Sequence, residues 1–141
     1  MRFYIGTPPV ERFALAHTGS DLIWVQCIPC RKCKPQNTPL FDPTKSSTYR
    51  RVRCDSLPCT LLSQNERQCG NSGECHYKYS YGDSSYNLGI LGVEKISFGN
   101  KGGVVFPKFT FGCAYYNEDT DKNKINDGLV GLGAGPLSLI S

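Results

Sequence analysis

The sequence predicts an all-β protein, and three observations support that prediction. Its 141 residues include 15 glycines and 9 prolines, a turn-rich composition that favours many short strands over long helices. Several short segments alternate apolar and polar residues with a period of two, as half-buried strands do. Hydrophobic residues make up 39% and charged residues 20%, which supports a packed core and argues against disorder. The length suits one domain.

The expected strands of the first part of the chain are separated by polar turns. Residues 1–5 form an amphipathic strand that is closed by a Gly-Thr-Pro-Pro turn, which a helix could not cross. Residues 12–16 alternate as a half-buried strand, and a polar turn at 17–20 leads to a short apolar strand at 22–25.

A second group of strands follows a long segment dominated by loops. Residues 75–81 alternate cleanly, and residues 88–98 can pair back on them as a hairpin. Residues 104–111 form another strand, and the acidic and amide-rich residues 117–127 are expected to form an exposed loop. Only residues 137–141 look like the beginning of a helix.

The composition excludes two broad classes of protein. No run approaches the roughly 18 consecutive apolar residues that span a bilayer, so no membrane span is predicted. The net charge is a modest +4, and the Lys and Arg residues are scattered. Without a basic stripe and interleaved aromatic residues, no nucleic-acid partner is predicted.

Eight cysteines are the unusual part of the composition. An even number in a turn-rich chain indicates a disulfide framework and an oxidising compartment, although spacing alone does not select the pairing. The spacing Cys27-x2-Cys30-x2-Cys33 would also suit zinc or an iron–sulfur cluster, but no second pair has that spacing. We therefore predict disulfides, no metal and no cofactor. The cysteines are Cys27, Cys30, Cys33, Cys54, Cys59, Cys69, Cys75 and Cys113.

The beginning of the chain does not resemble a secretion signal. Met1 opens directly onto an amphipathic strand and not onto a charged region followed by an apolar one. A secreted type of composition without an export signal leads us to expect that the start of the protein is missing.

A polar turn between two apolar strands is accompanied by further motifs in a fixed order. The turn is His17-Thr18-Gly19-Ser20, and alone it would be a weak signal because any hairpin offers one. The accompanying motifs are Ile5-Gly6-Thr7-Pro8-Pro9, Tyr81-Gly82-Asp83, Phe111-Gly112-Cys113 and Gly128-Leu129-Val130-Gly131-Leu132-Gly133.

With these motifs the chain resembles the N-terminal lobe of pepsin-like aspartic endopeptidases, and in particular their plant nepenthesin-type branch. It also resembles the N-terminal lobe of the cereal xylanase inhibitors. The resemblance covers nearly all of residues 1–141 and implies a single N-terminal lobe of the pepsin-like fold, with the C-terminal lobe absent. It also implies a cysteine-rich insert at 27–75 and a flap hairpin region at 77–98, with the hairpin itself at 77–92. The parent family is expected outside the cell, in the secretory pathway or in the vacuole.

The resemblance also implies roles for individual residues. Thr18, Gly19 and Ser20 belong to the active-site loop, and residues 128–131 thread behind that loop. Tyr81, Gly82 and Asp83 are implied to lie on the flap that contacts substrate, with Trp24 as the hydrogen-bonding neighbour of Tyr81. The implied disulfides are Cys27–Cys30, Cys33–Cys113, Cys54–Cys75 and Cys59–Cys69.

Two residues depart from the family pattern. His17 occupies the position of the catalytic aspartate, and Ser84 replaces a flap glycine, which is expected to stiffen the tip or to exclude positive-φ turns. Family catalysis needs two carboxylates about 3 Å apart that share one proton. Neither Asp21 nor Asp83 is expected to substitute for the missing one, and His76, without an acidic partner in sequence, is expected at the surface.

Three hypotheses about function remain open at this stage. The chain is part of an aspartic endopeptidase that acts on peptide or protein substrates and is inactive as it stands, because His17 in acid would be protonated. Alternatively, it is a non-catalytic binding protein comparable to the xylanase inhibitors. The third hypothesis, a homodimeric protease in the retroviral style, would bring two His17 side chains together with no carboxylate.

Overall fold

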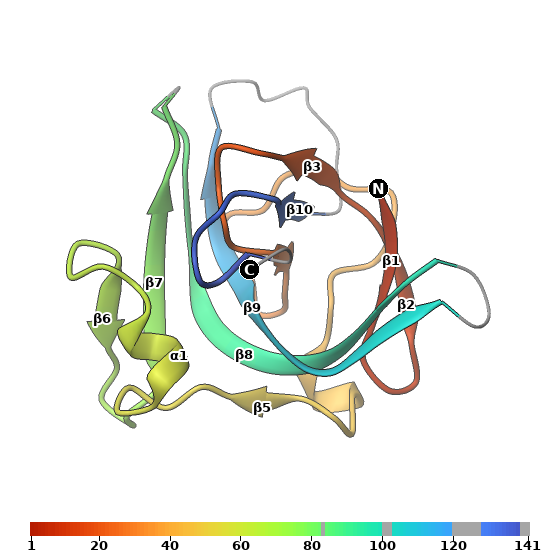
Figure 1. Cartoon of the computed structure of the whole chain (residues 1–141), viewed down its shortest axis with the longest axis horizontal. Helices are drawn as coiled ribbons and strands as arrows, with labels where there is room; N and C mark the ends of the chain where they lie inside the picture. Colours follow the sequence, from red (N-terminus) through yellow and green to blue (C-terminus); the bar gives the residue numbers. More distant parts are fainter. Residues whose placement is uncertain (83, 100–102, 120–127, 139–141) are drawn as a thin grey trace.

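The structure is a computed structural model that describes residues 1–82, 84–99, 103–119 and 128–138. Within these residues ten strands form one mixed sheet, accompanied by a 3-10 turn, η1 (Pro43–Lys45), and a short helix, α1 (Leu57–Thr60) (Figure 1). The predicted all-β class is therefore confirmed. The strands are β1 (Arg2–Ile5), β2 (Val10–Phe13), β3 (Leu15–His17), β4 (Trp24–Gln26), β5 (Arg50–Arg51), β6 (Arg67–Cys69), β7 (Cys75–Ser80), β8 (Tyr86–Phe98), β9 (Val104–Glu118) and β10 (Gly128–Gly131).

Two long strands, β8 and β9, organise the sheet and curve around the core (Figure 1). The main path runs β2-β1-β8-β9-β4-β10-β3, and β5 and β7 add to β8 outside that path. The pairs β4–β9 and β10–β3 are parallel. The β8–β9 register shifts between Leu88 and Gly89 and again between Glu94 and Ile96, and irregularities of this kind let a long strand bend.

The main core lies on the inner face of this curved sheet. Phe3, Ile5, Val25, Ile96 and Phe111 are among its fully buried members, and Phe3 and Ile96 alternate with more exposed neighbours along their strands. A second cluster packs the cysteine-rich segment against β7 and β8, and it includes Leu22, Cys59, Tyr77 and Leu91. No helix among the described residues is long and apolar enough to cross a membrane.

The strand expected at residues 12–16 is divided into β2 and β3. The backbone of Ala14 exchanges two hydrogen bonds with that of Met1, each 2.8 Å long, which ends the pairing of β2 with β1. After Ala14 the chain leaves this edge, and β3 pairs instead with β10. A tertiary partner far along the sequence thus divides a segment that the periodicity treats as continuous.

The last predicted strand is longer than expected. It was predicted over residues 104–111, but β9 continues to Glu118 because it pairs with β8 along its length and also with β4. The expected loop at 117–127 therefore begins later, and its residues 120–127 lie outside the described part of the chain. Of the expected helix start, Leu137 lies in a turn and residues 139–141 are also outside the described part.

All four implied disulfide pairings are wrong. The bridges in the structure are Cys27–Cys113, Cys30–Cys33, Cys54–Cys69 and Cys59–Cys75.

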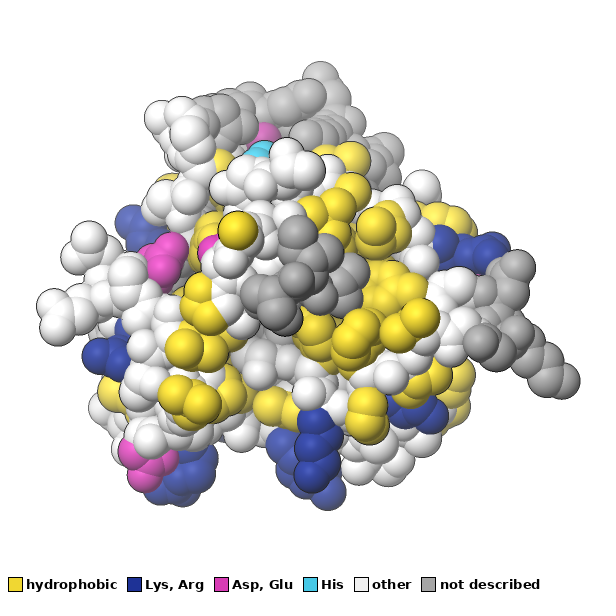
Figure 2. Space-filling model, viewed as in Figure 1, with side chains coloured by type: hydrophobic (Ala, Val, Ile, Leu, Met, Phe, Trp, Pro, Cys, Tyr) yellow, Lys and Arg dark blue, Asp and Glu magenta, His cyan; other side chains and the backbone are white. Residues whose placement is uncertain are grey.

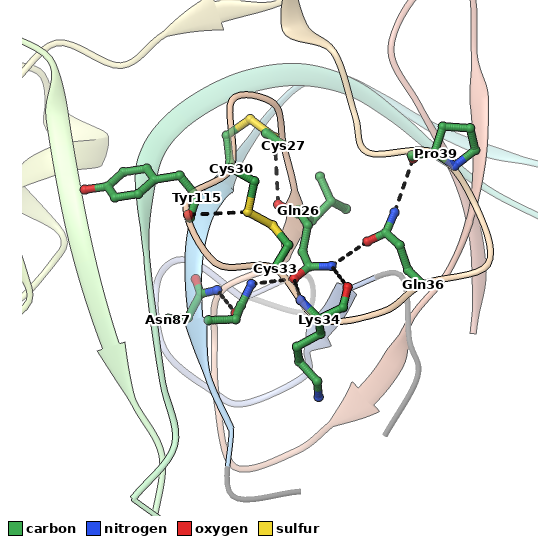
Figure 3. The surroundings of a disulfide bond; sticks show 12 residues. Gln26, Cys27, Cys30, Cys33, Lys34, Gln36, Pro39, Asn87 and Tyr115 are labelled. Carbon is green, nitrogen blue, oxygen red and sulfur yellow. Dashed lines mark hydrogen bonds between the residues drawn. A yellow bond between two sulfur atoms is a disulfide. The ribbon is translucent and has the colours of Figure 1, made fainter. Parts of the chain in front are cut away.

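The first two bridges follow from the position of β4 beside β9. In their parallel register Val25 lies opposite Cys113, and the backbone N–H of Cys27 donates to Ala114. Cys27 is thereby placed beside Cys113, which leaves Cys30 to bridge Cys33 within the following loop (Figure 3).

The other two bridges join cysteines of the insert that are similarly buried or similarly accessible to solvent. Cys59 on α1 and Cys75 at the start of β7 are both fully buried, and they bridge each other. Cys69, which lies opposite Cys75 in the β6–β7 register, is exposed and bridges Cys54. The implied pairing would have joined each buried cysteine to a more exposed one.

Candidate active site

The loop that links β3 to β4 centres on His17. His17, Thr18 and Gly19 are exposed, whereas Ser20 is buried. Nδ1 of His17 accepts a hydrogen bond of 3.1 Å from the backbone N–H of Gly19. A ring nitrogen that accepts a hydrogen bond carries no proton, so this geometry requires the tautomer protonated on Nε2. A Cβ atom at Gly19 would lie only 2.8 Å from Cε1 of the His17 ring, so a larger residue at this position would displace the exposed imidazole.

Strand β10 supports this loop from behind. It runs parallel to β3 with Gly131 opposite His17, and the backbone N–H of Leu132 donates to the His17 carbonyl over 2.8 Å. The backbone N–H of Gly133 donates to the Ser20 carbonyl over the same distance. The Gly-rich segment therefore fixes both ends of the loop, in the arrangement expected for residues 128–131.

Asp21 is occupied by this support and does not point into the loop. Its Oδ1 accepts a 3.0 Å hydrogen bond from the Gly135 backbone, and its own N–H donates to the Tyr79 hydroxyl over 3.1 Å. A Cβ atom at Gly131, Gly133 or Gly135 would collide with Asp21. The carboxylate thus caps the Gly-rich segment.

The hairpin formed by β7 and β8 covers the loop with aromatic side chains. Nε1 of Trp24 donates a 2.8 Å hydrogen bond to the Tyr81 hydroxyl. The ring of Tyr81 also meets that of His17 edge to face, with centroids 5.9 Å apart. Trp24 packs with Ala114 and Leu129 beneath Tyr81. The expected Trp24–Tyr81 pair is therefore present and lies against the loop.

The tip of this hairpin is a tight turn. The backbone N–H of Ser84 donates to the Tyr81 carbonyl over 3.1 Å, and that of Tyr81 donates to the Ser85 carbonyl over 2.9 Å. Gly82 is exposed at the tip, and Asp83 lies outside the described residues. Ser84 itself adopts φ 72°, so serine at this position does not exclude every positive-φ turn, and the expected stiffening of the tip stays a prediction.

The hydroxyl of Ser20 is the polar atom of the loop that lacks a partner. It is buried, and the described residues offer it no hydrogen bond. The loop therefore presents an imidazole and a buried hydroxyl, but none of the described residues places an uncommitted carboxylate beside them.

A second polar cluster was missed by the sequence reading. Nε2 of His76 lies 3.1 Å from Oε1 of Glu74, and Nδ1 of His76 lies 3.2 Å from the Tyr115 hydroxyl. His76 thus has the acidic partner that it was expected to lack. The hydrogen bond from His76 lowers the pKa of the Glu74 carboxyl, and the charge of Arg51 lowers it further. The spacing Glu-x-His at the start of a strand was the available signal, because residues two apart share a face.

The comparisons with known proteins agree with this arrangement. A family model described as "Xylanase inhibitor N-terminal" matches residues 1–141. The chain is 49% identical over 144 residues to a probable aspartic protease of Arabidopsis thaliana, with 100% of this chain and 32% of the relative covered. It is 44% identical over 141 residues to aspartic proteinase nepenthesin-1 of Nepenthes gracilis, with 100% and 31% covered.

Nepenthesin-2 of the same plant is 40% identical over 141 residues, again with 100% of this chain and 31% of the relative covered. The chain thus spans about a third of the length of these relatives. By this match, the chain belongs to the xylanase inhibitor N-terminal family, whose fold is the N-terminal lobe of the pepsin-like proteins, and it is similar to plant aspartic proteases that include the nepenthesins.

Proposed function

We propose that this chain is the N-terminal lobe of a two-lobed, aspartic-endopeptidase-like protein, and that it binds peptide without supplying a catalytic carboxylate. The observation that carries the proposal is His17, which holds the centre of the loop through its hydrogen bond with the Gly19 backbone. The loop is preserved in shape while the acid is absent.

The chemistry of the site argues against acid proteolysis. The family mechanism uses one carboxylate to activate water and another to polarise the scissile carbonyl, with one proton shared between them. In acid an imidazole is protonated and cannot take a proton from water. Asp21 cannot take over, because its Oδ1 is committed to the Gly135 backbone.

The surface of the lobe supports its pairing with a further part of the protein. Large apolar side chains are exposed on β2, β3 and the start of β9, and Figure 2 shows hydrophobic side chains gathered in the middle and right-hand part of one face. Such gatherings are rare on monomeric proteins and mark interaction surfaces. The relatives are about three times as long as this chain, so we assign the covering role to a C-terminal lobe. The exposed side chains are Val10, Phe13, Leu15, Val104 and Val105.

Within this lobe, residues 27–75 act as the cysteine-rich insert and residues 77–98 as the flap region. Tyr81 and Gly82 on the flap contact the bound peptide, and Trp24 orients Tyr81 through the hydrogen bond to its hydroxyl. The four disulfides support folding in the secretory pathway and a location outside the cell or in the vacuole.

A second candidate is a non-catalytic inhibitor or binding protein on the same fold. The description of the matching family names xylanase inhibitors. A loop held by the hydrogen bond between His17 and Gly19 keeps its shape for binding peptide but does not hydrolyse it. This candidate predicts micromolar or tighter binding of a protein such as a glycanase, which calorimetry detects.

The test of the main proposal restores the carboxylate. The chain is joined to the C-terminal lobe of a nepenthesin, and hydrolysis of a denatured protein in acid is compared for the unaltered form and for His17→Asp. We expect hydrolysis only with His17→Asp. As a control, Thr18→Asp places the same group one residue away, in an exposed position, and should gain nothing.

Two results would overturn the proposal. Comparable hydrolysis by the unaltered form would show that His17 supports catalysis. No hydrolysis by a folded His17→Asp form would show that the loop is not a peptidase half-site.

A further inference from the structure

A cavity of about 620 Å³ lies on the side of the sheet that faces away from the active-site loop. Cys113 and Tyr115 of β9 line it, whereas Ala114 between them packs under Trp24 and Tyr81. Successive residues of a regular strand point to opposite faces, so at Cys113 and Ala114 the cavity and the loop occupy opposite faces of β9, and Tyr115 is the extra residue of the bulge opposite Leu88 and Gly89. A ligand in the cavity would therefore leave the peptide-binding face open.

The walls of the cavity are mainly apolar. Side chains of the cysteine-rich segment line most of the walls, together with one residue of β8 and the disulfide between Cys27 and Cys113. The volume is within the range of small-molecule sites, which bury an apolar body and orient it by a few polar groups. The apolar residues are Ile28, Pro29, Pro43 and Ile90.

Two arginines bring positive charge to this apolar space. The backbone N–H of Arg31 donates to the Tyr115 carbonyl over 2.8 Å, and its guanidinium lies 5.4 Å from the centre of the Tyr115 ring. Figure 3 shows the Tyr115 side chain pointing from β9 towards β7, beside Cys30. The aromatic ring and the backbone contact thus hold Arg31 at the rim of the cavity.

The second arginine comes from β5. Arg51 lines the cavity, whereas its neighbour Arg50 points to the other face of β5 and donates to the carbonyls of Ser47 and Tyr49. Among the described residues, no carboxylate lies within 4.0 Å of the guanidinium of Arg31 or Arg51. Neither guanidinium is therefore held in a contact ion pair, and Arg51 interacts with the Tyr49 phenol and, at longer range, with the charge of Glu74.

His76 keeps the nearest acid out of the cavity. It lines the cavity itself and is bonded to Glu74 on one side and to the Tyr115 hydroxyl on the other. Glu74 does not line the cavity; its Oε1 is bonded to His76, and its buried Oε2 has no hydrogen-bond partner among the described residues. No Asp or Glu is therefore among the described residues of the lining, which carries two positive guanidinium groups.

We propose that this cavity binds a small organic acid with an apolar body. The carboxylate lies between Arg31 and Arg51, which bind carboxylates well because the guanidinium fork matches their geometry. The apolar body packs against the prolines and the Cys27–Cys113 disulfide. An inorganic anion would leave these apolar walls unused, so it binds more weakly.

The test is calorimetric titration of the oxidised chain with sodium 2-naphthoate. The neutral amide 2-naphthamide and sodium sulfate serve as comparison ligands. We expect the carboxylate to bind about tenfold or more tightly than either, because only it combines the charge with the apolar body. Arg31→Gln and Arg51→Gln should each weaken its binding about tenfold, and Arg50→Gln should change it less than about twofold.

Each remaining outcome contradicts the proposal. Equal affinity for acid and amide would show that the arginines do not recognise the charge, and equal affinity for sulfate would show that the apolar walls contribute nothing. An equal loss in Arg50→Gln and Arg51→Gln would place the anion elsewhere, and no binding of naphthoate by the unaltered chain would exclude the site. Near-ultraviolet circular dichroism, recorded for every variant, confirms that the comparison is between folded proteins.

Discussion

At the active-site loop, one nitrogen of the His17 imidazole stabilises the turn, but the ring does not supply the carboxylate that acid proteolysis needs. Nδ1 of His17 accepts the Gly19 N–H and so preserves the turn, but the ring, unlike a carboxylate, has no oxygen to activate water. The Ser20 hydroxyl, three residues further on, is buried without a partner among the described residues. We interpret this hydroxyl as one that the loop would satisfy with a carboxylate, since buried polar groups are ordinarily paired.

The flap tip stores a measurable amount of backbone strain at Ser84. Its φ of 72° is left-handed, a region that costs an ordinary residue about 1 kcal/mol or more relative to glycine. Ser84→Gly removes this cost but adds freedom to the unfolded chain, so we expect a gain of up to about 1 kcal/mol in the free energy of unfolding. Ser85→Gly, without a positive φ, should destabilise the protein by about as much. Urea denaturation measures both, and a loss in Ser84→Gly would contradict the strain.

A pH dependence is expected at Glu74. Because the hydrogen bond from His76 lowers its pKa in the folded state, the charged carboxylate stabilises the fold above its usual titration range. That stabilisation is lost as the pH falls from about 4.3 through the lower folded value. Melting temperatures of the unaltered protein and of Glu74→Gln should therefore converge in this acidic range. Asp55→Asn, at an exposed ion pair, controls for loss of a surface charge, and a constant difference for Glu74→Gln would contradict the assignment.

At the scale of elements, the disulfides differ greatly in what they constrain. Cys27–Cys113 joins residues 86 apart and fixes β4 beside β9, whereas Cys30–Cys33 closes a loop of residues only three apart. The bridges Cys54–Cys69 and Cys59–Cys75 span 15 and 16 residues and hold the insert on the hairpin. The entropy removed from the unfolded chain grows with loop length.

Removal of these bridges should therefore have unequal effects. Replacing both members of Cys27–Cys113 by alanine should lower the free energy of unfolding by about 4–5 kcal/mol, and replacing both members of Cys30–Cys33 by serine by about 2 kcal/mol. Chemical denaturation of the two double variants gives the difference. Equal losses would mean that loop length does not control their stabilisation, and disulfide mapping by mass spectrometry independently checks the pairing.

At the scale of the whole molecule, a chain of buried amides ties the flap hairpin to the cysteine-rich loop. The Tyr77 hydroxyl donates to Asn87, Asn87 donates to Asn117, and Asn117 donates to Oε1 of Gln26 over 2.8 Å. Gln26 in turn accepts from the Lys34 backbone over 2.7 Å. Figure 3 shows Gln26 between Asn87 on one side and Lys34 and Gln36 on the other. This chain connects β7, β8, β9 and β4 through side chains.

Breaking the chain at its centre should be costly. Asn87→Ala leaves the Tyr77 hydroxyl and the side-chain amide oxygen of Asn117 buried without partners. We therefore expect a loss of about 2–4 kcal/mol in the free energy of unfolding. The exposed Asn37→Ala is the matched control and should stay within about 0.5 kcal/mol of the unaltered protein. Similar losses in the two variants would show that the amide chain contributes no stability.

Much of this architecture could be predicted because it depends on neighbours in sequence. Alternation of apolar residues located β7 and β8 to within two residues, whereas the resemblance placed residues 128–131 behind the active-site loop without predicting the strand β10. The resemblance correctly implied the family and placed Trp24 beside Tyr81. The same reasoning failed where a long-range partner decides the strand boundaries. At Ala14 the segment predicted as one strand changes its pairing partner, from β1 for β2 to β10 for β3.

The sequence by itself determined the all-β class, the family and the absence of an aspartate from the active-site loop, since these depend on residue identity, order and local period. The tertiary structure alone decided the cysteine pairing, the Glu74–His76–Tyr115 cluster and the cavity behind β9. Each of these depends on strand register and depth of burial. Those quantities arise only when segments tens of residues apart pack together, and no local pattern carries them.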